Sequence, residues 1–259
     1  MLPFILGLND LLRHILARQV LSIVHIYLHW FRWCEISMPK NGSNIVAQYS
    51  SASFPNIGSP HTFRLGVDHV SKSDPNIRTL VKKIGVIDFH LDGDPFESLV
   101  EAIISQQLNG AVARTIFGRL KAMVNSETIT AESLGRVPVP KMRKAGVSPQ
   151  KIRYLKDLTS RILGGKLNLH DLKRRPDDEI IRQLDEVKGI GPWTAHMFLL
   201  FTLGRTDVLP VDDLGIQKSI QRVYSLRKRP NAERINKIAD SWHPYCSIAS
   251  LYLWHAKDT

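Results

Sequence analysis

The sequence predicts an all-α fold for the chain from about residue 75 to its C-terminus. Apolar residues recur there at intervals of three and four, which places them on one face of a helix. Asp-Pro and Gly-Gly pairs mark where such segments begin and end. We find no convincing run of alternating apolar and polar residues that would indicate a strand, and no internal repeat of fixed period.

The first clear helix follows Asp94 and Pro95, which suit an N-cap and a first-turn position. Its apolar face consists of Phe96, Leu99, Val100, Ile103 and Ile104. Similar spacing predicts further helices over residues 109–124, 149–163 (ended by Gly164-Gly165), 178–187, 193–203, 232–242 and 246–255. The segment 193–203 is apolar almost all round, so we expect it to be buried.

A glycine-rich turn joins two of these helices and reads Lys188-Gly189-Ile190-Gly191-Pro192-Trp193-Thr194-Ala195. Gly189 stands where a left-handed residue ends a helix, and Pro192 stands where the next helix begins. Bare backbone N–H groups at a helix N-terminus form an anion site. A plain helix corner that uses glycine for chain reversal fits the turn equally well. Farther along the chain, Asp212 and Asp213 place a carboxylate at the start of another helix.

The composition favours a polyanionic partner. The chain has 35 Lys and Arg against 24 Asp and Glu, a net charge of +11 and a pI near 9.8. Such an excess is typical of nucleic-acid binding, although solvated lysines on a basic protein would give the same count. Its length of 259 residues allows one or two domains.

The cysteine count limits the other classes of site. Cys34 and Cys246 are too few for a disulfide framework, a four-cysteine zinc site or a cubane iron–sulfur cluster, so we expect no metal. Their scarcity also suggests a reducing intracellular compartment.

The N-terminal part differs from the rest. Residues 1–37 are rich in Leu, Ile, His and Trp, but charged residues interrupt the run. We therefore expect no membrane span. No basic stretch precedes the first apolar run and no small-residue cleavage site is clear, so we expect no signal peptide either. Residues 38–74 are polar and predict a loop or linker. Because Met38 lies at the join, a start codon assigned too far upstream would explain residues 1–37. The main domain is expected over residues 75–259.

Two further segments carry candidate functional residues. The helix that begins at Asp94 ends in consecutive amides and a leucine, among them Gln107 and Leu108, which could enter a duplex in place of an extruded base. A helix terminus with polar residues in solvent is the simpler alternative. Aromatic residues cluster over 242–254 and most belong to the core, whereas Trp193 stands beside the polar turn, where its ring face could meet a base.

Four motifs together resemble the helix-hairpin-helix DNA glycosylase superfamily. They are Ile104-Ser105-Gln106-Gln107, the turn within 187–195, Pro210-Val211-Asp212-Asp213-Leu214-Gly215, and Trp242-His243-Pro244-Tyr245 through Trp254. Within that superfamily they look like the alkylpurine branch, DNA-3-methyladenine glycosylase II. The resemblance covers about residues 75–257. It implies two helical lobes with the active cleft between them, and base excision repair by hydrolysis of the N-glycosidic bond of damaged bases.

The resemblance also implies a catalytic aspartate, for which two neighbours compete. The family's carboxylate is followed three residues later by an apolar residue, which is Ile216 for Asp213 but Gly215 for Asp212. We therefore assign Asp213 as the catalytic residue and expect Asp212 to be a helix N-cap or a supporting neighbour. Departure of the base leaves positive charge on the sugar, which a buried carboxylate stabilises while it orients water.

Trp193 predicts the reaction type. Members of the superfamily that also cut the strand carry a lysine at the matching position, where it forms a Schiff base with the sugar. Tryptophan has no amine, so the resemblance implies a monofunctional hydrolase that leaves an abasic site and needs no cofactor. Cys246 departs from the family, whose members usually show arginine there, and this puts a local salt bridge in doubt.

The remaining site residues are expected to bind the DNA. The damaged base must leave the stack, and its pocket is formed by Trp193, Met197 and Trp254. Gln107 and Leu108 are expected to fill the gap that the extruded base leaves in the duplex. A phosphate is expected to bind at the turn formed by Lys188, Gly189, Ile190 and Gly191. Aromatic walls attract cationic rings, which favours 3-methyladenine and, more slowly, 7-methylguanine.

The expected partner is double-stranded DNA with a damaged base. We expect the protein to bind it as a monomer and to have no membrane partner. The expected location is the cytoplasm or nucleoid of a prokaryote, or a nucleus. Two alternatives stay open. One is a glycosylase for deaminated or oxidised bases. The other is a helix-hairpin-helix protein that binds DNA without chemistry, against which Asp213 beside Trp193 argues.

Overall fold

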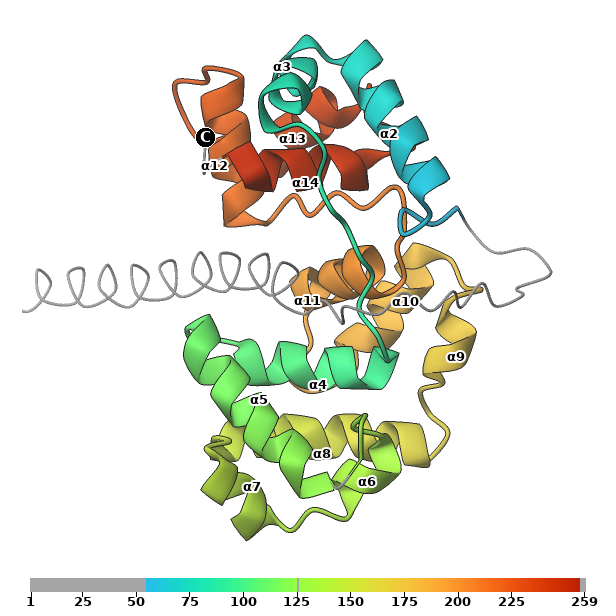
Figure 1. Ribbon diagram of the computed structural model, residues 1–259, viewed down its shortest axis with the longest axis vertical. Helices are drawn as coiled ribbons and strands as arrows, with labels where there is room; N and C mark the ends of the chain where they lie inside the picture. Colours follow the sequence, from blue (N-terminus) through green and yellow to red (C-terminus); the bar gives the residue numbers. More distant parts are fainter. Residues whose placement is uncertain (1–54, 125, 257–259) are drawn as a thin grey trace, which may run out of the picture.

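Helices form most of the described part of the chain (Figure 1). The structure is a computed structural model, and it describes residues 55–124 and 126–256. Apart from an isolated antiparallel bridge between Asn56 and Arg205, these residues form no strand, which confirms the all-α prediction. The helices are α2 Pro60–Ser73, α3 Pro75–Ile84, α4 Pro95–Ser105, α5 Gly110–Val124, α6 Ala131–Gly135, α7 Val139–Ala145, α8 Pro149–Leu163, α9 Leu169–Leu172, α10 Asp177–Asp185, α11 Pro192–Met197, the π-helix η1 Phe198–Thr202, α12 Leu214–Val223, α13 Ala232–Ala239 and α14 Cys246–His255.

The helix contacts fall into two groups. Helix α14 packs against α2, α3 and α12, and these helices gather at one end of the molecule with α13 (Figure 1). Helices α4 to α8 pack on one another at the other end, while α10 and α11 lie between the groups (Figure 1). The chain passes between the groups after α3 and again before α12. The two-lobe cleft expected from the resemblance remains a prediction.

Local signals start the helices where the sequence predicted them. The Asp94 carboxylate accepts hydrogen bonds from the amides of Phe96 and Glu97, and Pro95 occupies the first turn of α4. Ser148 caps α8 in the same way through the amide of Lys151. A side-chain acceptor satisfies amides that have no partner inside a helix, so these caps fix where each helix begins.

Helix α2 contradicts the loop that was expected over residues 38–74. Its polar sequence carries a narrow apolar face that packs on α3 and α14, and Val70 is fully buried. Gly66 lies so close to α14 that a Cβ there would stand 2.6 Å from Ile248. Tertiary packing stabilises this helix against a composition typical of loops. The expectations for residues 1–54 lie outside the described residues.

The helix expected over 193–203 is present and buried, but it changes type along its length. Helix α11 runs from Pro192 to Met197, and η1 continues it as a π-helix over Phe198–Thr202, whose residues are all buried. π-Helical turns are frequent at functional sites. The predicted helix over 232–242 ends early, at Ala239. None of the described helices is both long and apolar enough to cross a bilayer.

Candidate active site

The carboxylate of Asp213 is buried at the N-terminus of α12. Its side chain has 0% exposure, and Oδ1 accepts a hydrogen bond from the amide of Ile216 at 2.8 Å. Asp213 is therefore itself the N-cap of α12, so the expectation that Asp212 caps this helix is wrong. The N-cap fits Asp213 because its backbone is extended and its carboxylate points back over the first turn.

Two tryptophans from distant segments donate to the same carboxylate. The indole N–H of Trp193 on α11 reaches Oδ2 of Asp213 at 3.0 Å, and that of Trp254 on α14 reaches Oδ1 at 3.0 Å. With the Ile216 amide, three N–H groups fix the orientation of the carboxyl group. A polar group at full burial requires such partners, and their number leaves Asp213 little freedom to turn away.

Two of the predicted pocket residues, Trp193 and Trp254, meet at Asp213, and Met197 lies one turn after Trp193 on α11. Trp193 is half-buried, whereas Trp254 is 3% exposed and Met197 is 8% exposed. The Trp254 ring stacks on Phe201 of η1, with centroids 5.7 Å apart and an interplanar angle of 24°. Of the three, Trp193 is the most exposed, while Trp254 mainly supports Asp213. Their role as walls of a base pocket remains a prediction.

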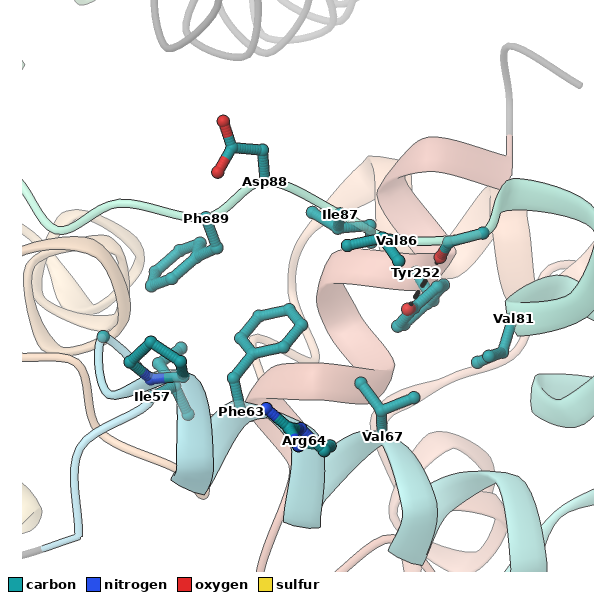
Figure 2. A pocket seen from close by; sticks show the side chains of 13 residues that line it. Ile57, Phe63, Arg64, Val67, Val81, Val86, Ile87, Asp88, Phe89 and Tyr252 are labelled. Atoms are coloured by element: carbon teal, nitrogen blue, oxygen red, sulfur yellow. Dashed lines mark hydrogen bonds between the residues drawn. The ribbon is translucent and has the colours of Figure 1, made fainter.

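An aromatic row extends from Trp254 to an apolar pocket away from Asp213. Phe201 lies 6.1 Å from Phe89, and Phe89 stacks on Phe63 at 5.9 Å. Figure 2 shows Phe63 and Phe89 among the residues that line this pocket of 610 Å³, between α2, the segment after α3 and Tyr252. Neither Asp213 nor Trp193 contributes to its lining. The pocket is therefore separate from the carboxylate site.

The glycine-rich turn has the conformation that its sequence predicts. Gly189 has a φ of +83°, and a Cβ at this position would stand 2.1 Å from the ring of Tyr154 on α8. Glycine is thus required both by the left-handed backbone and by the contact with Tyr154. Gly191 is the N-cap of α11, and a Cβ there would meet no atom within 4 Å.

Some backbone amides of this turn donate hydrogen bonds within the protein, and others do not. The Lys188 amide donates to Asp157 at 3.0 Å, and the Ile190 amide donates to the carbonyl of Val187 at 3.0 Å. No group of the described residues accepts from the amides of Gly189 and Gly191. Lys188 itself is exposed. Two free amides and a lysine at this end of α11 suit an anion.

The segment expected to fill the duplex follows α4 and contacts the turn. Gln107 is exposed with a φ of +56°, and Leu108 is half-buried. The side-chain amide of Gln106 donates to the carbonyl of Gly189 at 2.6 Å. This hydrogen bond joins two segments that are 83 residues apart in the sequence, a link that the sequence alone did not indicate.

A family model agrees with this arrangement. The model of the HhH-GPD superfamily of base excision DNA repair proteins matches residues 100–244. The chain belongs to the HhH-GPD superfamily. It is 34% identical over 191 residues to DNA-3-methyladenine glycosylase 1 of Schizosaccharomyces pombe, which covers 72% of this chain and 84% of that protein.

Solved HhH-GPD structures resemble the fold. The crystal structure of a DNA-3-methyladenine glycosidase from Bacillus halodurans superposes with a TM-score of 0.70 at 33% identity, covering 79% of this chain and 92% of that one. The 3-methyladenine DNA glycosylase of Schizosaccharomyces pombe, solved in complex with abasic DNA, gives a TM-score of 0.67 at 32% identity, covering 75% and 97%. Membership of the superfamily thus rests on sequence and on fold.

Asp212 occupies the surface of this HhH-GPD site. Its side chain is exposed, while the adjacent Asp213 is fully buried. Burial lowers the pKa of His196 on α11, and the negative charge of Asp212 partly offsets that shift. Asp212 therefore acts on the electrostatics of α11, and its role as a supporting neighbour of Asp213 remains a prediction.

Cys246, at the position where the resemblance led us to expect arginine, belongs to a small polar cluster. Asp207 binds His243 Nδ1 at 2.8 Å and accepts from the Cys246 amide at 3.2 Å. The Cys246 sulfur lies 3.5 and 3.8 Å from the two nitrogens of His243, so it rests against the ring face, where neither nitrogen lone pair points. Burial and Asp207 raise the pKa of the thiol well above its usual range, which makes it unreactive. The cluster fastens the loop at Asp207 to the first turn of α14.

Proposed function

We propose that this protein is a base excision repair glycosylase that hydrolyses the N-glycosidic bond of alkylated purines and leaves an abasic site. The observation that carries the proposal is the buried Asp213 carboxylate, fixed by the indoles of Trp193 and Trp254. DNA binding alone requires no such group. Relatives and fold neighbours named DNA-3-methyladenine glycosylases support the substrate class.

Asp213 stabilises the charge that develops on the sugar. As the base departs, the sugar becomes oxocarbenium-like, and a buried carboxylate stabilises it more than one exposed to bulk solvent would. The three N–H donors already fix the carboxylate in its orientation before the reaction, so its reorientation adds no free energy to the barrier. Asp213 also orients the water that completes the hydrolysis.

The substrate must be a base removed from the stack of a DNA duplex. Gln107 and Leu108 fill the gap that the base leaves, while Lys188 and the amides of Gly189 and Gly191 hold a phosphate beside it. Phosphate contacts from a basic protein give affinity that falls as salt rises. We propose that the protein acts as a monomer, in the compartment that contains the DNA.

The half-buried Trp193 ring favours positively charged bases. Alkylation at N3 or N7 gives a purine a positive charge and weakens its glycosidic bond, and an indole face attracts a cationic ring more than a neutral one. We therefore propose 3-methyladenine as the preferred substrate and 7-methylguanine as a slower one, with little action on 8-oxoguanine or uracil.

A panel of duplexes tests this function. Otherwise identical duplexes carry 3-methyladenine, 7-methylguanine, 8-oxoguanine or uracil, and alkali reveals abasic sites after incubation with the protein. We expect release of the methylated purines, and no strand cleavage before alkali because Trp193 has no amine. Faster release of uracil or 8-oxoguanine contradicts the substrate class, and a covalent adduct trapped by borohydride contradicts the monofunctional reaction. Binding without any abasic site indicates a non-catalytic DNA-binding protein.

A further inference from the structure

Lys151 makes an unusual contact with the end of α4. This helix ends at Ser105, and the last carbonyls of a helix have no partner within it. The ammonium of Lys151, which enters from the first turn of α8, donates to the carbonyls of Ile104 and Gln106, each at 2.6 Å. A cation here also interacts favourably with the negative end of the α4 dipole.

Partial burial of the Lys151 ammonium is unfavourable, so other interactions must stabilise the charge. Lys151 is half-buried, and no carboxylate of the described residues lies within ion-pair distance of it. Burial lowers its pKa to about 8. Placing a charge in such a site costs free energy unless it forms strong hydrogen bonds, and the two carbonyls of the α4 terminus supply them.

The turn that Lys151 contacts has a strained backbone. Gln107 adopts a φ of +56°, a left-handed conformation that costs free energy in a residue other than glycine. Such a conformation persists only when the surroundings enforce it. Lys151 fixes the carbonyl that precedes Gln107, and the Gln106 side chain fixes the same turn to the carbonyl of Gly189. The turn is thus held from α8 and from the glycine-rich turn.

We propose that Lys151 is a positioning residue for base extrusion, which holds the turn of Gln107 and Leu108 in the conformation that enters the duplex. The inference rests on the proposed function, because extrusion has meaning only for an enzyme that removes a base from the stack. Lys151 does not touch the reacting atoms and acts through Gln107. Its loss should therefore impair extrusion more than the binding of DNA that has no base to extrude.

Lys151→Met tests the proposal, with Lys156→Met as the matched control. Lys156 is an exposed lysine on the same helix, so the control removes the same charge without touching α4. We expect Lys151→Met to lower the single-turnover rate on 3-methyladenine about 10- to 100-fold, as small misplacements of a positioning group do. Lys156→Met should keep the wild-type rate.

Two readouts separate positioning from general loss of structure. Fluorescence of 2-aminopurine placed next to the lesion rises when the damaged base leaves the stack, and this rise should occur with wild type and Lys156→Met but not with Lys151→Met. Affinity for a duplex with a tetrahydrofuran abasic analogue should be similar in all three. The proposal is overturned if Lys151→Met keeps the wild-type rate and the wild-type fluorescence rise. It is also overturned if Lys151→Met loses affinity for the abasic duplex by the same factor as it loses excision rate.

A rescue experiment keeps the proposal falsifiable if Lys151→Met is poorly folded. Asparagine adopts the left-handed conformation more readily than glutamine does. Adding Gln107→Asn to Lys151→Met should therefore restore part of the fluorescence rise, and the single variant Gln107→Asn sets the largest rise that the double variant can reach. Should Lys151→Met melt below the assay temperature, Lys151→Gln replaces it in every comparison. Absence of rescue in folded protein contradicts an action through Gln107. If wild type excises no base, the proposed function fails, whereas an active Lys151→Met contradicts this inference alone.

Discussion

The indole N–H of Trp193 donates to Oδ2 of Asp213 at 3.0 Å, joining the glycine-rich turn to the start of α12. We propose two duties for Trp193: its N–H orients the carboxylate, and its half-buried ring stacks on the base. The geometry makes the position of Asp213 dependent on the segment that is expected to bind a phosphate. If DNA binds at this turn and Asp213 carries the chemistry, as we propose, one side chain couples the two.

Replacing Asp213 by asparagine should abolish excision and leave DNA binding largely intact. Loss of one preorganised electrostatic group costs on the order of 100- to 1000-fold in rate, while affinity depends mainly on phosphate contacts. Single-turnover excision and binding of an abasic-analogue duplex measure the two effects. The matched control is Asp212→Asn, which alters an exposed carboxylate and should stay active. An inactive Asp212→Asn beside an active Asp213→Asn would show that the assignment is wrong by one residue.

The two duties of Trp193 can be separated by a pair of variants. Trp193→Phe keeps an aromatic face but removes the donor to Asp213, so it should slow excision yet retain the preference for methylated purines. Trp193→Ala should lose both, with a further cost of about 1–3 kcal/mol, the worth of a base–aromatic stack. Competing rates on 3-methyladenine and uracil duplexes measure the preference. Equal preference in the two variants would contradict stacking by Trp193.

Alanine at the two glycines of the turn should have different effects. Gly189→Ala forces a side chain into a left-handed backbone and against Tyr154, so it should destabilise the protein, by about 1–3 kcal/mol for the backbone alone. Gly191→Ala meets no protein atom and should keep the melting temperature. Because its methyl group keeps a phosphate from the amides, we expect its DNA binding to weaken by about 1 kcal/mol or more. Unchanged affinity in a folded Gly191→Ala would argue against phosphate binding at this turn.

Protein that starts at Met38 should fold and excise as well as the full chain. The first described helix, α2, begins at Pro60, and the family model begins matching at residue 100. Thermal melting and excision rates of the two proteins measure the difference. Loss of solubility or activity on truncation would mean that residues 1–37 contribute to the folded domain.

Asp92 and Glu101 should make the free energy of unfolding rise as the pH falls from about 8 to about 5. Burial, together with the charge of Glu101, raises the pKa of Asp92 to about 7, and burial with the charge of Glu97 raises the pKa of Glu101 to about 7. The Thr202 hydroxyl opposes the shift of Asp92. Both pKa values exceed those of the unfolded chain, so the folded state binds more protons between about pH 4 and 7 and loses stability as they leave.

Asp92→Asn isolates this effect. The variant should raise the melting temperature at pH 8 by a few degrees, corresponding to about 1 kcal/mol or more, and should raise it less at pH 5. Asp88→Asn serves as the control, because the Asp88 side chain is 70% exposed and should change little. A gain at pH 5 as large as that at pH 8 would show that ionisation of Asp92 is not the cause.

Local sequence signals determined much of this protein. The Asp94-Pro95 start of α4, the helix over 149–163 and the left-handed Gly189 follow from caps, prolines, glycines and apolar spacing, which act within a few residues. The motifs also sufficed to indicate the superfamily, because their order and spacing are specific. They placed a carboxylate at the start of α12, although they left Asp212 and Asp213 to be weighed by an apolar residue three positions on.

Tertiary structure decided what depends on distant segments. Helix α2 exists because α3 and α14 cover a face too narrow to stand out in a polar sequence. Packing buried Asp213 and left Asp212 in solvent, and it brought two indoles from 20 and 41 residues away onto one carboxylate. Lys151 reached the α4 terminus across 47 residues of sequence. Apolar spacing and caps report only a residue's own turn of helix, so contacts of this range are fixed only when the helices pack.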